Sequence, residues 1–290
     1  MATTAAFGLR ALAAATVVTA LLAPSALHAQ EGDPYTLETM QELNEDLKAL
    51  WMDIQIEQIE FLKLDKDKEH SGARIHRQPF RWVANDVRRN ADGRNLTYLV
   101  DQDGLPGIGP EEAIDRAMAT WASGKCLRKA DVVKRTDTGA DADLFDGLLG
   151  YGGLGDHRLG GIVHAGWMPP DFFDAVGGPG RGETVLAFSV TFIYVGADGE
   201  PTDVDGNGYL DVATSEIYYN GAFAWLLDEG DGGGFDVESV ALHEIGHSLG
   251  LGHTAPEADA VMRPVYSGVN RSVQDLDGAA LCSIWGRWPK

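Results

Sequence analysis

Three histidines and one glutamate lie within eleven residues near the C-terminal end of the 290-residue chain. His243 and His247 are four residues apart, so on a helix their side chains lie one above the other on the same face. Two imidazoles in that arrangement can share one metal ion, and Glu244 lies one step round the helix, beside the open side of the metal. The spacing therefore predicts a metal-binding helix that also carries a carboxylate able to accept a proton.

Gly250 and His253 extend this pattern beyond the helix. A glycine can leave a helix in a left-handed conformation, which turns the chain back and lets His253 supply a third nitrogen ligand. Three protein ligands and a water are typical of a catalytic zinc site, whereas a structural zinc site is closed by a fourth side chain. We therefore predict a catalytic zinc ion held by His243, His247 and His253.

The stretch from His243 to His253 resembles the zinc-binding signature of the metzincin endopeptidases. The resemblance implies that all three histidines bind zinc. It also implies that Glu244 is the general base, which takes a proton from the zinc-bound water as this water attacks the peptide carbonyl.

A methionine follows nine residues after the third histidine, in the segment Ala-Val-Met-Arg-Pro-Val-Tyr. This segment resembles the methionine turn of the matrixins, a metzincin family, and implies that Met262 lies beneath the zinc ligands. By the same resemblance, Pro264 and Tyr266 would form one wall of the specificity pocket. The resemblance covers residues 73–290 and is strongest over 240–266.

The resemblance implies an α+β, metzincin-like (zincin) catalytic domain over residues 73–290, with a twisted, mostly parallel, five-stranded sheet and about three helices. Asp236 is a good N-cap for the metal-binding helix. Runs of β-forming residues and turn signals predict strands at 95–100, 131–135, 142–145, 161–165 and 185–195. Further helices are expected to begin near Pro110 and Gln274.

Residues 35–64 carry apolar side chains at steps of three and four, which predicts one amphipathic helix. The polar run 63–72 that follows has the composition of a linker. Residues 30–72 are therefore expected to form a helical N-terminal extension, which could be a propeptide, a docking helix or a lid. No cysteine precedes Cys126, so the extension has no candidate for the propeptide cysteine that keeps matrix metalloproteinases latent.

Residues 1–29 have the features of a secretory signal peptide. Arg10 is their one charge, residues 11–22 form an apolar core, and Ala-Leu-His-Ala at 26–29 is a possible cleavage site. A retained membrane anchor is the alternative, but the segment is short for a span, and no later segment is suited to cross a bilayer. We expect a secreted protein, extracellular or periplasmic. In that setting Cys126 and Cys282 could form a disulfide or remain buried free thiols.

The net charge of −21 argues against nucleic-acid binding and favours a soluble protein. The expected partners are protein or peptide substrates, and we expect a monomer without a membrane span once the leader is removed.

Four side chains with oxygen donors are spaced like the first ligands of a calcium loop: Asp203, Asp205, Asn207 and Asp211. Gly208 stands at the sixth position, where such loops turn sharply. Thr214 occupies the twelfth position, where an EF-hand has its bidentate glutamate, so a standard EF-hand is excluded. We interpret the segment as an EF-like loop that binds Ca²⁺; the alternative is a solvated acidic turn.

The sequence does not decide whether the protein has a second, structural zinc site. Residues 161–165, which include His164, resemble the matrixin segment that carries one ligand of such a site, and Asp156 and His157 lie just upstream. The family has a further histidine where this chain has residues 216–220, and that histidine is absent here.

The sequence thus predicts a secreted zinc endopeptidase. One alternative is a catalytically silent secreted binding protein in which the zinc ion only stabilises the fold. The intact Glu244 argues against this alternative, because a structural zinc ion needs ligands but no general base. Another alternative is an exopeptidase or a narrow-specificity processing peptidase, which peptides with blocked and free ends would distinguish.

Overall fold

The computed structural model describes residues 33–64, 75–89, 96–100, 109–136, 141–227, 233–256 and 258–289. The predicted signal peptide and the predicted boundary between extension and catalytic domain at residue 72 lie outside the described residues. Glu31–Lys290 cluster into one compact unit. Among the described residues, no helix is both long and apolar enough to cross a membrane.

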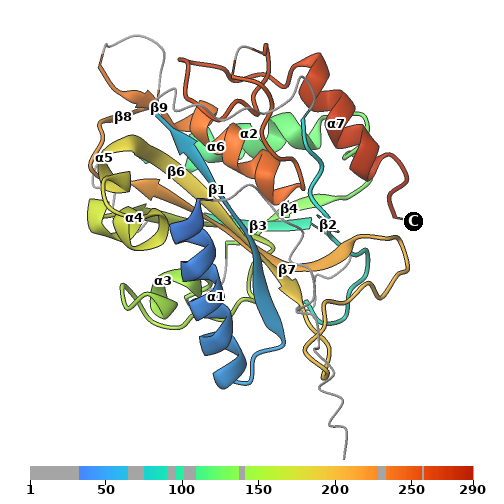
Figure 1. Ribbon diagram of the computed structural model, residues 1–290. Coiled ribbons are helices and arrows are strands. Elements are labelled where there is room, and N and C mark those ends of the chain that lie inside the picture. Colours follow the sequence, from blue (N-terminus) through green and yellow to red (C-terminus); the bar gives the residue numbers. More distant parts are fainter. Residues whose placement is uncertain are drawn as a thin grey trace, which may run out of the picture. The chain divides into compact units, whose positions relative to one another are not determined.

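One sheet organises the fold, with strand order β1-β6-β7-β5-β3-β4 and β2 paired to β7 (Figure 1). Four pairs, β2–β7, β3–β4, β3–β5 and β5–β7, are parallel, and β1–β6 and β6–β7 are antiparallel. The strands are β1 Ile54–Lys63, β2 Phe80–Arg81, β3 Leu96–Val100, β4 Val132–Lys134, β5 Ile162–Met168, β6 Val185–Tyr194 and β7 Leu210–Asn220. A separate short ladder joins β8, Trp225–Leu226, to β9, Phe235–Asp236. The predicted α+β class with a mostly parallel sheet is confirmed, but the described residues contribute seven strands to this sheet where five were expected.

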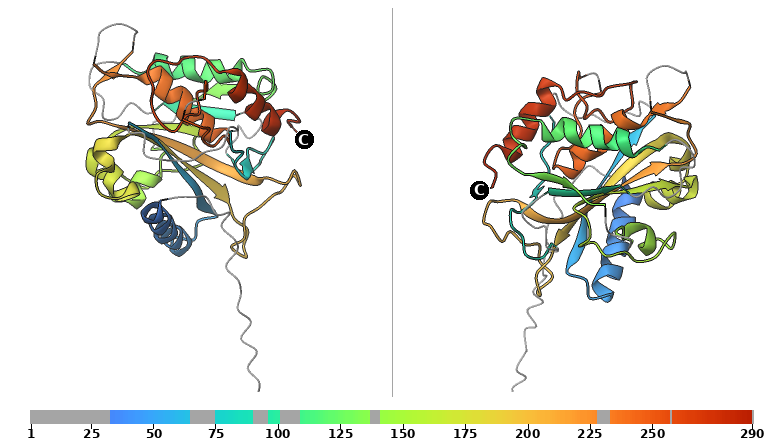
Figure 2. Two further views of the ribbon diagram at one scale, coloured as in Figure 1. Left: turned by 45° about the horizontal axis from the view of Figure 1, so that its top comes forward. Right: turned by 180° about the vertical axis from the view of Figure 1, so that it is seen from behind.

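Helices cover both faces of this sheet (Figure 2). On one face lie α2 Glu111–Ala122, α6 Val237–Ser248 and α7 Asp275–Trp285, and on the other lie α1 Pro34–Ala49, α3 Phe145–Leu148 and α4 Pro170–Gly177. The short helix α5, Arg181–Thr184, leads into β6. Each face has its own apolar core: Trp121, Leu242 and Trp285 belong to the first, and Phe172 and Phe188 to the second.

The N-terminal extension is helical only in its first half. Asp33 caps α1 by accepting a hydrogen bond from the Tyr35 N–H at 3.0 Å, and α1 ends at Ala49. Trp51 then adopts a left-handed backbone conformation with φ of 59°, and the chain reverses into β1. The prediction of one helix over 35–64 is therefore wrong from residue 50 onward. The isoleucines of β1 follow a two-residue alternation at Ile54 and Ile56, which suits a strand packed on one face.

The strand predicted at 142–145 is also wrong, because helix α3 begins at Phe145. The carboxylate of Glu216 on β7 accepts hydrogen bonds from the N–H groups of Leu144 and Phe145, both at 3.0 Å. These are N–H groups that the start of a helix leaves without an intrahelical partner. A carboxylate 71 residues away in sequence therefore sets the local conformation.

A disulfide links Cys126, in the turn after α2, to Cys282 in α7. The bridge joins the end of α2 to α7, two helices on the same face of the sheet as α6. Of the two alternatives left by the sequence, the structure has the disulfide and no free cysteine.

Candidate metal centre

Helix α6 is fixed at both ends. Asp236 accepts a hydrogen bond from the Ser239 N–H at 2.8 Å, which caps the helix start, and Arg271 pairs with the Asp236 carboxylate. At the other end Gly250 has φ of 93°, a conformation that glycine adopts without strain, and its N–H donates to the His247 carbonyl at 2.8 Å. The chain therefore turns directly after the helix and brings His253 back toward it.

The three predicted ligands meet at one point. Nε2 of His243 lies 3.0 Å from Nε2 of His247 and 3.3 Å from Nε2 of His253. The opposite ring nitrogens all face oxygens: Nδ1 of His243 contacts the Val261 carbonyl at 2.8 Å, and Nδ1 of His247 contacts the Leu251 carbonyl at 2.7 Å. A carbonyl can only accept, so these Nδ1 atoms carry the proton and the Nε2 atoms present lone pairs.

Burial keeps these imidazoles neutral. It lowers the pKa of His243 to about 4 and lowers the pKa values of His247 and His253 well below the ordinary range. Three neutral rings thus direct lone pairs into a common buried space, an arrangement that is repulsive unless a cation occupies it. The residues present therefore fit a zinc ion with three nitrogen ligands.

Glu244 is fully buried beside this cluster. Among the described residues, neither of its carboxylate oxygens accepts a hydrogen bond of ordinary geometry. Burial raises its pKa well above the ordinary value, and the Ser189 hydroxyl on β6 opposes this effect. A nearby cation would offset the cost of burying this charge and keep the carboxylate ionised, so that it can accept a proton.

Met262 lies directly against helix α6. It is fully buried, and a Cβ atom at Gly246 would collide with its sulfur. The Met262 carbonyl accepts a hydrogen bond from the Thr254 N–H at 2.8 Å, which joins this turn to the residue after the third histidine. The buried carboxylate of Asp277 on α7 accepts from the N–H groups of Val261 and Met262 at 2.8 and 3.2 Å. Asp277 belongs to the helix predicted to begin near Gln274, but its contact with the methionine turn was not predicted.

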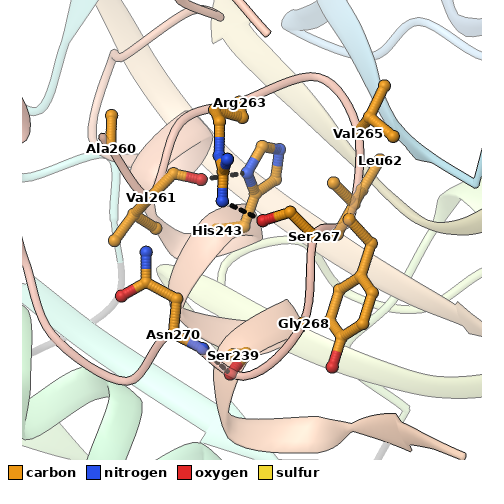
Figure 3. Close-up of a pocket in the computed structure, with 11 residues that line it drawn as sticks. Leu62, Ser239, His243, Ala260, Val261, Arg263, Val265, Ser267, Gly268 and Asn270 are labelled. Atoms are coloured by element: carbon orange, nitrogen blue, oxygen red, sulfur yellow. Dashed lines mark hydrogen bonds between the residues drawn. The ribbon is translucent and has the colours of Figure 1, made fainter. Parts of the chain in front are cut away.

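A pocket opens next to His243 (Figure 3). Tyr266 lines it, whereas Pro264 is not among its lining residues. Leu62 of β1 and Val265 lie together at one side of the pocket. Of the two residues predicted to form a pocket wall, Tyr266 thus lines a pocket that His243 also lines, and Leu62 of the N-terminal extension lies in the same pocket.

A sequence profile of the matrixin peptidase family matches residues 195–286, which include the three histidines and Met262. Over 117 residues the chain is 36% identical to Metalloendoproteinase 5-MMP of Arabidopsis thaliana. The alignment covers 34% of this chain and 32% of the plant protein. Residues 195–286 therefore resemble a matrixin-type metzincin domain.

Two further relatives agree with this assignment. Matrix metalloproteinase-25 of Homo sapiens is 33% identical over 84 residues, which cover 27% of this chain. Karilysin of Tannerella forsythia is 34% identical over 70 residues, which cover 24% of this chain. The chain covers only 14% of the length of each of these two proteins.

One residue that contacts the histidine cluster was not predicted from the sequence. Oε2 of Glu60, on β1, lies 3.2 Å from Nδ1 of His253, so a carboxylate holds the outer nitrogen of the third histidine. Oε1 of Glu60 accepts hydrogen bonds from Gln58 and Gln78 at 2.7 and 3.3 Å. The period-two pattern of Ile54 to Glu57 was the available signal, since it indicates a strand rather than a helix.

The predicted calcium loop brings carboxylates of Asp203, Asp205 and Asp211 within 4.8 Å of one another. Asp203 also accepts from the N–H groups of Asn207 and Gly208, at 3.0 and 2.9 Å. Asp211 differs from the expectation: it is fully buried and its Oδ2 binds Arg88 at 2.8 Å and Thr202 at 2.6 Å. An ion in this loop would therefore share Asp211 with a guanidinium group.

Among the described residues, His157 and His164 do not share a cluster of potential metal ligands. Within the described ranges, groups of three or more potential metal ligands occur at two places only, and neither group includes these histidines. His164 is fully buried, its ring stacks on Tyr219, and Nδ1 lies 2.7 Å from the Tyr219 hydroxyl. Its role in this arrangement is core packing.

His164 should make the protein less stable in acid. Burial lowers its pKa to about 3 in the folded state, against about 6.5 in an unfolded chain. Between these values the unfolded chain binds a proton that the folded chain does not, so stability falls as the pH drops below about 6.5. At pH 5 this proton uptake should lower the free energy of unfolding by about 2 kcal/mol.

Urea unfolding at pH 7.5 and at pH 5 measures this effect. Between the two pH values, the free energy of unfolding of His164→Gln should fall by about 2 kcal/mol less than that of wild type. The exposed His76→Gln variant serves as the control, and equal losses in all three proteins would contradict the prediction.

Proposed function

We propose that this chain is a secreted zinc-dependent endopeptidase, which hydrolyses internal bonds of protein or peptide substrates. The observation that carries the proposal is the convergence of the Nε2 atoms of three neutral histidines beside the buried carboxylate of Glu244. The matrixin-type domain and the metalloproteinase relatives support it.

His243, His247 and His253 would hold the zinc. When bound, zinc is a Lewis acid that makes a water nucleophilic near neutral pH. Glu244 accepts a proton from the attacking water and passes it to the leaving amine. The Nδ1 contacts to the Val261 and Leu251 carbonyls and to Glu60 keep the rings in the required tautomer and orientation.

The test combines metal analysis with proteolysis. The exported protein should contain zinc, and it should cleave an unfolded protein as well as peptides with blocked ends. A chelator should abolish cleavage, and added zinc should restore it. Zinc binding without cleavage of any peptide, both in wild type and in the Leu62→Asp variant described below, would instead favour a binding protein in which zinc only stabilises the fold. Cleavage limited to free-ended peptides would favour an exopeptidase.

Export through a signal peptide at residues 1–29 is part of the same proposal. The leader pattern and the disulfide between Cys126 and Cys282 support it, because disulfides form and persist in oxidising compartments. Mass spectrometry of protein recovered outside the cytoplasm should find a mature N-terminus near residue 30.

Calcium should stabilise the fold weakly through the loop at 203–211. An ion that binds only the folded state raises stability as its concentration rises. The loop lacks the twelfth-position glutamate and shares Asp211 with Arg88, so we expect a dissociation constant of about 10⁻⁴ to 10⁻³ M. Melting curves with the zinc site saturated should show a calcium-dependent shift in wild type and in the Asp198→Ala control, and a smaller shift in Asp205→Ala. Equal shifts in all three proteins would mean that the loop is a solvated acidic turn.

A further inference from the structure

Strand β6 packs against the helix that carries two of the three histidines, and the outer edge of β6 is filled by β1. Helix α6 packs on β6, and Ser189 of β6 faces Glu244. β1 pairs antiparallel with the whole length of β6, from Ile54 opposite Tyr194 to Lys63 opposite Val185. An extended peptide that binds beside a strand needs the free N–H and C=O groups of that strand. Here the same chain already supplies the partner strand.

The end of β1 is paired on both of its sides. The Lys63 N–H donates to the Pro264 carbonyl at 3.1 Å, and the Lys63 carbonyl accepts from the Tyr266 N–H at 2.9 Å. These bonds form a parallel bridge between Lys63 and Val265. The end of β1 thus lies between β6 and the segment 264–266.

Two side chains of β1 occupy the positions next to the metal ligands. Leu62 is 3% exposed and lies in the pocket that His243 lines (Figure 3). Glu60 binds the outer nitrogen of His253. An extended peptide substrate would need to make contacts of the same kinds. These are an apolar group in the pocket, a polar group at a metal ligand, and a backbone paired on both sides.

We propose that β1 is an internal occupant of the peptide-binding cleft, which keeps the chain closed to substrates until β1 leaves the edge of β6. The inference rests on the proposed peptidase function, since it concerns the regulation of that site. Because β1 is tethered, it competes at a high effective concentration. The apparent affinity for a peptide is then reduced by the fraction of molecules in which β1 is displaced. Glu60 is a positioning residue in this scheme, since it reaches the centre only through His253.

The test weakens the docking of β1 in the zinc-loaded full chain. Leu62→Asp places a carboxylate in the pocket, and Leu37→Asp adds the same charge to α1, away from the site. Hydrogen exchange reports whether β1 has left β6, and binding of a peptide hydroxamate reports whether the cleft is open. We expect β1 of Leu62→Asp to exchange about tenfold faster or more, and the hydroxamate to bind at least about tenfold more tightly than to wild type and Leu37→Asp. Equal hydroxamate affinity in the three proteins overturns the proposal.

A cysteine pair provides a second measurement that does not depend on the folding of Leu62→Asp. Gln58 and Thr191 are register partners on β1 and β6, so Gln58→Cys/Thr191→Cys can lock the two strands together. The locked protein should bind the hydroxamate more weakly than wild type, and mild reduction should restore the wild-type affinity. Wild type treated in the same way controls for reduction of the native disulfide. Unchanged affinity on locking overturns the proposal.

Hydrolysis measured on the same proteins separates the two claims. If wild type, Leu62→Asp and the locked protein all cleave a peptide at the same rate, the closed state is wrong and the peptidase function stands. If Leu62→Asp binds zinc and the hydroxamate more tightly but cleaves no peptide, the closed cleft stands and the peptidase function is wrong.

Discussion

A Glu244→Gln variant is expected to keep its zinc and to lose nearly all peptide hydrolysis. Glutamine has the shape of glutamate, and the contacts that orient the three histidines come from Val261, Leu251 and Glu60. It cannot accept the proton of the attacking water, so the rate should fall by about 10² to 10⁴-fold. Zinc content by metal analysis and initial rates on a blocked peptide, in wild type and in the Leu62→Asp background, measure the two effects separately.

The matched control is Glu238→Gln on the same helix. Glu238 is also buried, but its carboxylate pairs with Arg116 at 2.7 Å and is not part of the histidine cluster. This variant should keep both zinc and activity, with a change in stability only. If Glu244→Gln hydrolysed peptides at a rate close to wild type, another group would have to be the base.

Removing a ligand should have a different signature. His247→Ala deletes the Nε2 that lies 3.0 Å from that of His243, and leaves two protein ligands where a catalytic zinc site has three. The zinc content should fall from about one ion per chain to near zero after dialysis, and hydrolysis should disappear with it. Metal analysis and activity measured on one preparation test this together.

His157→Ala is the control for deletion of a buried histidine. Its ring is 6% exposed but lies outside the histidine cluster, so zinc and activity should both persist. Circular dichroism and melting curves establish that each variant is folded. Retention of zinc by His247→Ala at full stoichiometry would show that the ligand set is different.

The local features of the matrixin domain were predictable because they depend on residues close together in sequence. The distance of four residues between His243 and His247 places both rings on one helix face, and Gly250 permits the turn that returns His253. Asp236 caps the helix because its side chain reaches an N–H three residues later. In the same way, the β-forming run at 185–195 became β6.

Contacts between distant residues decided the rest. The apolar residues of 54–63 fit a helix or a strand, and pairing with β6, more than 120 residues later, makes them a strand. Glu216 accepts the hydrogen bond that allows a helix to begin at Phe145. Arg88 donates a hydrogen bond to Asp211, one of the carboxylates expected to bind calcium. The same holds for Glu60, whose carboxylate reaches His253 across 193 residues of sequence. A sequence pattern predicts which backbone conformation a segment can adopt, but the hydrogen-bonding partner that selects it comes from elsewhere in the chain. The chemistry of the centre was therefore readable in one stretch of sequence, whereas the strand that lies across it appeared only in the tertiary structure.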